Sequence, residues 1–82
     1  MTITDENENY FSTSDLALSA TLSLYFPLES VDKTNPQKVE FFFKKSPDLE
    51  KLVDDFWRGQ LLVEPQAYFN RIKGIKARIY DR

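Results

Sequence analysis

The sequence contains no cysteine and no histidine, and it has only two glycines among its 82 residues. Without cysteine there is neither a disulfide framework nor a thiolate that acts as nucleophile or metal ligand. Without histidine the chain also lacks the commonest general base and the commonest metal ligand. Two glycines are too few for a phosphate-cradling loop. These absences predict a protein that is not an enzyme and that binds neither a metal nor a cofactor.

Carboxylates are the remaining candidates for acid–base chemistry, and their spacing does not favour it. Asp54 and Asp55 are adjacent, and adjacent positions of a helix point about 100° apart, so the two groups do not converge on one substrate. Glu50 and Asp54 are four residues apart and share a helix face, which is typical of a solvated acidic surface. We therefore expect a non-catalytic protein.

Long apolar runs are absent too. No run approaches the ~20 residues that span a bilayer, and residues 1–10 are acidic and polar, unlike a signal peptide. We therefore expect a cytoplasmic protein without a membrane partner. The length allows one domain. Residues 1–9 have little to bury and are expected to form a flexible acidic N-terminus, which leaves 10–82 as the domain. A chain this short has a small free energy of unfolding, and dimerisation would increase it by burying more surface.

Hydrophobic periodicity predicts an α+β domain in the order β-α-β-β-α-α. A short strand at 10–12 precedes the segment 14–26, which fits both strand alternation and a helix. Its length and its leucine and alanine content favour a helix, stopped by Pro27. Residues 28–33 and 37–45 are expected to form a hairpin around an Asn-Pro turn. The predicted architecture is a small antiparallel sheet with helices on one face.

Two amphipathic helices are predicted after the hairpin. Ser46-Pro47-Asp48 is a helix start, with a hydroxyl N-cap, proline at the first helical position and an acid in the first turn. The apolar stripe of this helix consists of Leu49, Leu52, Val53, Phe56 and Trp57. We expect this stripe, Trp57 included, to be buried. Gly59 is expected to end the helix in a left-handed conformation.

The last predicted helix begins at Pro65. Its expected buried stripe consists of Tyr68, Phe69, Ile72, Ile75 and Ile79. Gly74 lies inside this helix and makes helix formation about 1 kcal/mol less favourable than alanine would. A close approach of other backbone to Gly74 would explain its presence, and we expect one.

Charge is unevenly distributed along the chain, although the net charge is only −2. Residues 1–64 hold twelve acids and six bases, whereas residues 65–82 hold one acid and five bases. On the helical wheel, one flank of the apolar stripe of the last helix carries Arg71, Arg78 and Arg82, and the other flank carries Lys73 and Lys76. Such a face either contacts phosphates or an acidic protein surface, or it is the solvated side of an amphipathic helix.

The strand 38–44 is the strongest in the chain. Alternation places Val39, Phe41 and Phe43 on the face that we expect to form the core. The opposite face carries Lys38, Glu40, Phe42 and Lys44. An exposed Phe42 would stack on a nucleic-acid base while the two lysines hold phosphate. Alternatively, Phe42 packs under the N-terminal segment or against a second copy of the chain.

Four sequence blocks resemble a family of small uncharacterised bacterial, archaeal and phage proteins, known as a domain of unknown function. The blocks are Phe11–Leu18, Lys38–Phe43, Phe56–Gly59 and Val63–Phe69. The likeness covers about residues 10–80. It implies no activity and assigns no functional residue. It does imply a phage or mobile-element setting, which favours small binding proteins and inhibitors over metabolic enzymes.

We therefore expect a non-catalytic binding module, with two hypotheses for its partner. The first is nucleic-acid association through the face of the strand 38–44 that carries Phe42, together with the bases of the last helix. The second is a protein-interaction module or inhibitor. In that case the same strand face or the sheet edge pairs with a partner protein, or with a second copy that forms a homodimer. The acidic charge of residues 1–64 favours the second hypothesis.

Overall fold

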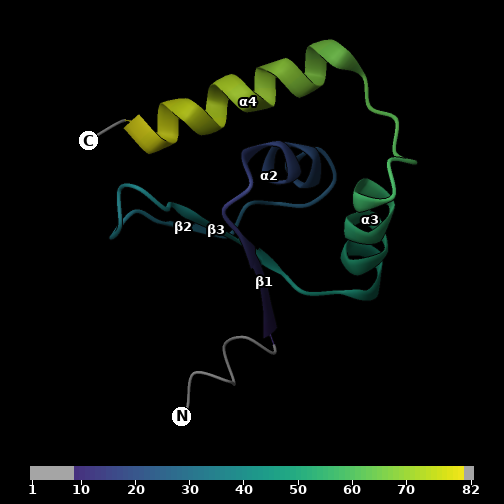
Figure 1. Ribbon diagram of the computed structural model, residues 1–82, viewed down its shortest axis with the longest axis horizontal. Helices are drawn as coiled ribbons and strands as arrows, with labels where there is room; N and C mark the ends of the chain where they lie inside the picture. The colour runs from purple at the N-terminus through teal and green to yellow at the C-terminus, as the bar shows by residue number, and fades with distance from the viewer. Residues whose placement is uncertain (1–8, 81–82) are drawn as a thin grey trace.

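The computed structural model describes residues 9–80, and the order of elements in this part of the chain is the predicted β-α-β-β-α-α (Figure 1). The elements are β1 (Tyr10–Thr13), α2 (Leu16–Ser23), β2 (Ser30–Asp32), β3 (Glu40–Lys44), α3 (Pro47–Trp57) and α4 (Pro65–Tyr80). The predicted α+β class is confirmed. The flexible segment expected at residues 1–9 lies outside the described residues apart from Asn9, and so does Arg82.

The three strands form an antiparallel sheet in the order β1-β3-β2, so β3 is the central strand. Phe43 lies opposite Phe11 of β1, and Phe41 lies opposite Val31 of β2. Phe41 and Phe43 are 1% and 0% exposed. The predicted core face of this strand is therefore confirmed for its two phenylalanines.

The loop between β2 and β3 is longer than predicted, and the two strands are shorter. Residues 33–39 belong to this connection and not to the strands. Its turn has the predicted chemistry. The N–H of Lys38 donates to the carbonyl of Asn35 at 3.0 Å, with Pro36 at the second turn position. At the end of β2, hydrogen bonds from the Thr34 side chain and backbone lower the pKa of Asp32 below its ordinary value.

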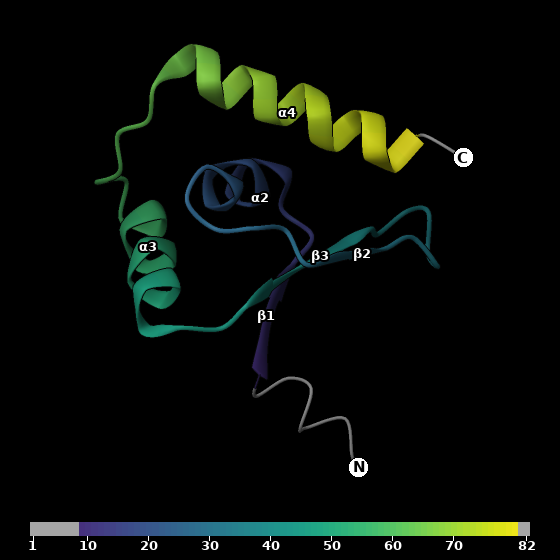
Figure 2. The same ribbon diagram turned by 180° about the vertical axis from the view of Figure 1, so that it is seen from behind.

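Helix α2 is the centre of the domain. Figures 1 and 2 both show α4 on one side of it, the β2–β3 ribbon on the other and α3 beside it. All five residues from Leu18 to Leu22 are buried. A helix that is buried all round has no single apolar stripe, which explains why residues 14–26 fitted strand alternation as well. The predicted helix is confirmed but shorter, since it ends at Ser23, before Pro27.

Two buried hydroxyls on α2 bond to the backbone of their own helix. Ser19 Oγ donates to the carbonyl of Asp15 at 2.8 Å, and Thr21 Oγ1 donates to the carbonyl of Ala17 at 2.9 Å. The carboxylate of Asp15 caps the helix by accepting from the N–H of Leu18 at 2.9 Å. Polar residues can therefore lie in the centre of the domain without unsatisfied hydrogen-bonding groups.

Helix α3 begins and ends as predicted. Ser46 Oγ accepts from the N–H of Leu49 at 3.1 Å, and Gly59 has a φ of +71°, the left-handed conformation that glycine adopts without a steric penalty. The prediction for Trp57 is wrong, because this side chain is 62% exposed. It stands at the end of the helix, beyond the part that packs on the core, and its ring makes an edge contact with Phe56.

The prediction for Phe69 is also wrong, since it is 61% exposed. The α4 side chains that pack on the core form a narrower stripe than expected, with spacing i, i+4, i+7, i+11. They are Tyr68, Ile72, Ile75 and Ile79. Phe69 lies beside this stripe, and its ring makes an edge contact with Tyr68. Burial of the narrow stripe fixes which sides of α4 remain available to solvent.

Candidate functional site: a cationic groove beside α4

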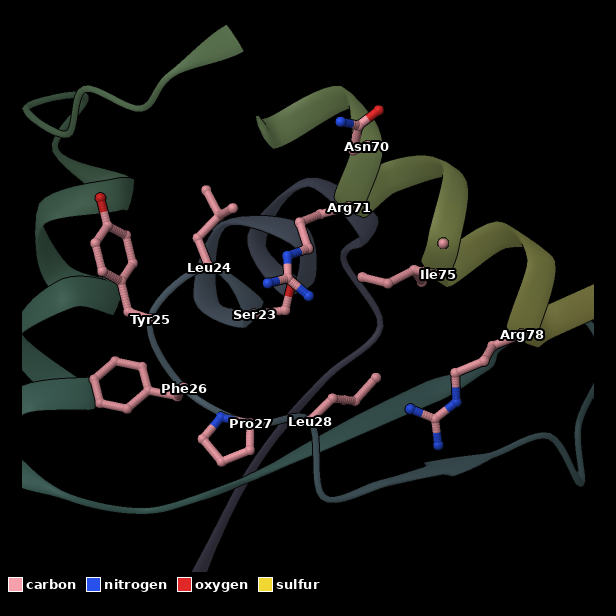
Figure 3. Close-up of a pocket in the computed structure, with 11 residues that line it drawn as sticks. Ser23, Leu24, Tyr25, Phe26, Pro27, Leu28, Asn70, Arg71, Ile75 and Arg78 are labelled. Atoms are coloured by element: carbon pink, nitrogen blue, oxygen red, sulfur yellow. The ribbon is translucent and has the colours of Figure 1, made fainter. Parts of the chain in front are cut away.

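An open groove of about 610 Å³ lies between α4 and the segment Ser23–Leu28, which connects α2 to β2 (Figure 3). One wall is this connecting segment. The α4 residues that line the groove are Asn70, Arg71, Gly74, Ile75 and Arg78. Their spacing of three or four residues places them on one side of the helix. The buried Ile75 joins this side of α4 to the core.

Two guanidinium groups face this groove. In Figure 3 the side chains of Arg71 and Arg78 extend from α4 toward the connecting segment. Seven residues of helix separate them, which corresponds to about 10 Å along the axis. Among residues 9–80, neither guanidinium forms an ion pair or a hydrogen bond, and the residues that line the groove include no carboxylate. The positive charge of the groove is therefore uncompensated by the described part of the chain.

The two walls of the groove are held by backbone hydrogen bonds and by one lysine. The N–H of Phe26 donates to the carbonyl of Leu22 at 2.8 Å, so the connecting segment leaves α2 in a tight turn. Lys33 Nζ donates to the carbonyl of Arg78 at 3.0 Å. A cation at this end of a helix satisfies a free carbonyl and complements the helix dipole. The lysine thus ties the hairpin to the end of α4 that carries Arg78.

Tyr25 adds an aromatic ring to the groove and is 54% exposed. The sequence pattern did not single out Tyr25, because this residue lies inside the segment 14–26 that was expected to be helical. The signal in the sequence was an aromatic pair, Tyr25 and Phe26, directly before Pro27. Such a position follows the end of a helix, where a ring is free to leave the core.

Gly74 lies in the groove wall between the two arginines. The backbone contact predicted for it is wrong, because a Cβ built at Gly74 would meet no atom within 4 Å. The glycine leaves a patch of helix backbone uncovered between Arg71 and Arg78. Nothing in the described part of the chain requires glycine here.

Of the other predicted binding residues, Phe42 and Lys44 share a face of the sheet, whereas Lys38 lies apart from them. Phe42 is half-buried on the opposite face of the sheet, where it lines a shallow hollow with Tyr10. Lys44 is exposed on that same face. Lys38 lies in the hairpin connection and lines a third hollow together with Tyr80 of α4. The predicted grouping of Lys38 with Phe42 and Lys44 is therefore wrong, because β3 begins only at Glu40.

The bases of α4 are divided between its sides. Arg71 and Arg78 line the groove, whereas Lys73 and Lys76 are exposed outside it. The helical-wheel prediction had placed the two arginines on one flank and the two lysines on the other, and the structure confirms this division.

These features define a small α+β domain with a cationic, carboxylate-free groove on one side and an open sheet face on the other. The chain matches the domain of unknown function DUF5659 over residues 8–81, and it belongs to this family. The resemblance noted in the sequence blocks is thereby confirmed. No curated protein and no solved structure is significantly similar to the chain.

Between residues 9 and 80, no three carboxylates gather closely enough to hold a metal ion. None of the helices in this range is long and apolar enough to cross a membrane.

Proposed function

We propose that this protein is a non-catalytic binding module that holds single-stranded nucleic acid in the groove between α4 and the segment Ser23–Leu28. The observation that carries the proposal is the pair of guanidiniums of Arg71 and Arg78, which form no ion pair among residues 9–80, in a groove that the exposed Tyr25 also lines. Guanidinium groups bind phosphate oxygens in a bidentate manner. Aromatic side chains stack on unpaired bases. The family resemblance supports a phage or mobile-element setting for this activity.

A single strand suits the groove better than a duplex does. In a duplex the bases are stacked on one another, so a protein ring has no free base face to contact. A single strand offers both its phosphates and its base faces. The groove offers groups for both, with guanidiniums on the α4 wall and Tyr25 on the other. The exposed Lys73 and Lys76 strengthen the positive field around α4 and attract the strand from a distance.

The proposal is tested with a fluorescein-labelled oligothymidine of about twelve nucleotides, titrated with the full chain and followed by fluorescence anisotropy. Two phosphate contacts to a single strand give a slope of log K against log salt of about −1.4. The affinity is then expected to fall about sevenfold between 50 and 200 mM salt. A duplex of the same length is expected to bind more weakly. Absence of binding at several hundred micromolar protein, or binding that salt does not change, would contradict the proposal.

Gly74→Ala is expected to change stability and binding in opposite directions. Alanine is favoured over glycine inside a helix by about 1 kcal/mol, and its methyl group meets no atom of the described chain. The variant is therefore expected to unfold at a higher urea concentration. The same methyl group narrows the groove between the two arginines, so the affinity for oligothymidine is expected to fall several-fold.

Ala77→Gly is the matched control, because Ala77 is an exposed residue of α4 that does not line the groove. It is expected to lose stability and keep its affinity. If Gly74→Ala were stabilised and bound oligothymidine as tightly as the unmodified chain, Gly74 would play no part in the site.

A further inference from the structure

The groove beside α4 is closed at the end that carries Arg78. Past this end the connecting segment continues into β2, and Lys33 Nζ donates to the carbonyl of Arg78 at 3.0 Å. This hydrogen bond joins the residue that follows β2 to α4. Between the groove and this bond, Val31 of β2 packs against the core, and so does Ile79 of α4. Side chains therefore fill the space between β2 and α4 beyond Arg78.

The other end of the groove, which carries Arg71, has no such closure. Helix α2 ends there at Ser23, whose hydroxyl donates to the carbonyl of Ala20 within the same helix. In Figure 3 the side chain of Asn70 points away from the connecting segment and does not cover this end. Within residues 9–80, no hydrogen bond or ion pair joins α4 to the segment Ser23–Leu28. The groove is thus open on the Arg71 side alone.

A groove with one closed end limits what a polynucleotide can do inside it. The two arginines are seven residues apart, or about 10 Å along the helix axis. This length corresponds to about three stacked nucleotides, at about 3.4 Å for each. A strand that enters beside Arg71 has to stop at Arg78, because the chain behind this residue is packed. The interior of a long strand would reach Arg78 only by folding back on itself.

We propose that the groove binds the end of a single strand and that Arg78 holds its terminal phosphate. The inference rests on the proposed function and names the part of the nucleic acid that the groove selects. A terminal phosphate monoester carries a charge of about −1.5 to −2 at pH 7, whereas a phosphodiester inside a strand carries one charge. Its three free oxygens suit the bidentate geometry of a guanidinium. Arg71 then contacts a phosphodiester nearer the entrance.

The carboxylates nearest to the closed end do not oppose this binding mode. Glu29 lines the hollow around Phe42, on the face of the sheet away from the groove. Strand alternation directs Asp32 to that same face. Asp81, which follows Arg78 by three residues, lies outside the described part of the chain. Among residues 9–80, the closed end therefore presents positive charge without a neighbouring carboxylate.

Competition between unlabelled oligothymidines tests the inference. Each competitor displaces an internally labelled fluorescent strand from the full chain, and all have the same length. The four competitors carry a 5′-phosphate, a 3′-phosphate, hydroxyl groups at both ends, or no ends because the strand is circular. A phosphorylated end is expected to bind about two- to fivefold more tightly than a hydroxyl end, as one additional exposed ion-pair charge provides. The two phosphorylated strands show which end the groove accepts.

The circular strand is expected to bind more than about tenfold more weakly than the linear strand with hydroxyl ends, because it loses the contact with Arg78. Arg78→Ala is expected to abolish the preference for a phosphorylated end. Arg71→Ala is the matched control, since it removes the same charge from the open end of the groove. It is expected to weaken the binding of every linear strand and to keep the preference. Far-UV circular dichroism checks that both variants are folded.

Equal affinities for circular and linear strands would overturn the inference and leave the groove as the binding site. Phosphorylated ends that bind no more tightly than hydroxyl ends would overturn the position of the terminal phosphate, and so would a preference that survives Arg78→Ala. If the chain binds neither linear nor circular strands, the proposed function itself fails. The two failures therefore give different results in the same experiment.

Discussion

Replacing Phe43 with alanine is expected to destabilise the folded protein by about 3–5 kcal/mol, the usual cost of removing a buried phenylalanine. Phe43 is completely buried in the central strand and belongs to the core cluster that joins the sheet to α2. A domain of this size has a total stability of roughly 4–12 kcal/mol. The substitution therefore removes a large part of the stability, and urea denaturation followed by far-UV circular dichroism measures the loss.

Phe42→Ala is the matched control for this prediction. It removes the same atoms from the neighbouring position of the same strand, but the side chain is only half-buried and lies on the other face. We expect it to cost about 1 kcal/mol. Equal costs for the two substitutions would mean that the open face is covered in solution by something as tightly packed as the core.

The double variant Arg71→Ala, Arg78→Ala is expected to weaken binding of oligothymidine by more than about 100-fold. Each hydrogen-bonded contact to a charged group contributes about 1.5–3 kcal/mol, and the variant removes two of them. The salt dependence is expected to become nearly flat, because the two phosphate contacts that release counterions are gone. Stability is expected to change little, since neither guanidinium has a partner among residues 9–80.

Lys73→Ala, Lys76→Ala is the control that separates a groove from a general electrostatic attraction. It removes the same charge from the same helix, but from residues outside the groove. We expect a loss of a few-fold in affinity, because these lysines act only through the field around α4. Equal losses from the two double variants would contradict the assignment of the site to the groove.

The sequence predicted correctly those features that depend on residues only a few positions apart, such as helix caps and strand alternation. Ser46, Pro47 and Gly59 define the ends of α3 through capping interactions within a few residues. Successive side chains of a strand point to opposite faces of the sheet. Alternation along the central strand therefore placed Phe41 and Phe43 on one face and Phe42 on the other. The helix at 16–23 was more difficult, because a helix surrounded by other elements has no polar face to mark its period.

The placement of Trp57 and Phe69 depended on tertiary packing that the helical wheel does not contain. A wheel shows which residues share a side, but it does not show how far a neighbouring element extends along the helix. Trp57 lies past the end of that contact, and Phe69 lies beside it. Both residues satisfied the apolar spacing equally well as core or as surface, so the sequence alone did not distinguish them.

One wall of the groove could be predicted from the sequence, and the other could not. The separation of Arg71 and Arg78 from Lys73 and Lys76 follows from helix geometry and was predicted. The opposite wall was not, because Ser23–Leu28 is more than forty residues away in sequence and no local pattern relates it to α4. Burial of Ile75 turns the arginine side toward that segment, and this is a consequence of the assembled core.

The most direct test of the central claim is a titration of the ¹⁵N-labelled chain with oligothymidine, followed residue by residue by NMR. The claim requires chemical-shift changes at the amides of residues 23–26 and 28 and at those of Arg71, Gly74 and Arg78. The amides of Ser12, Phe42 and Ser30 are expected to stay unchanged. Changes centred on Phe42, or changes spread evenly along the exposed side of α4 that carries Lys73 and Lys76, would contradict it.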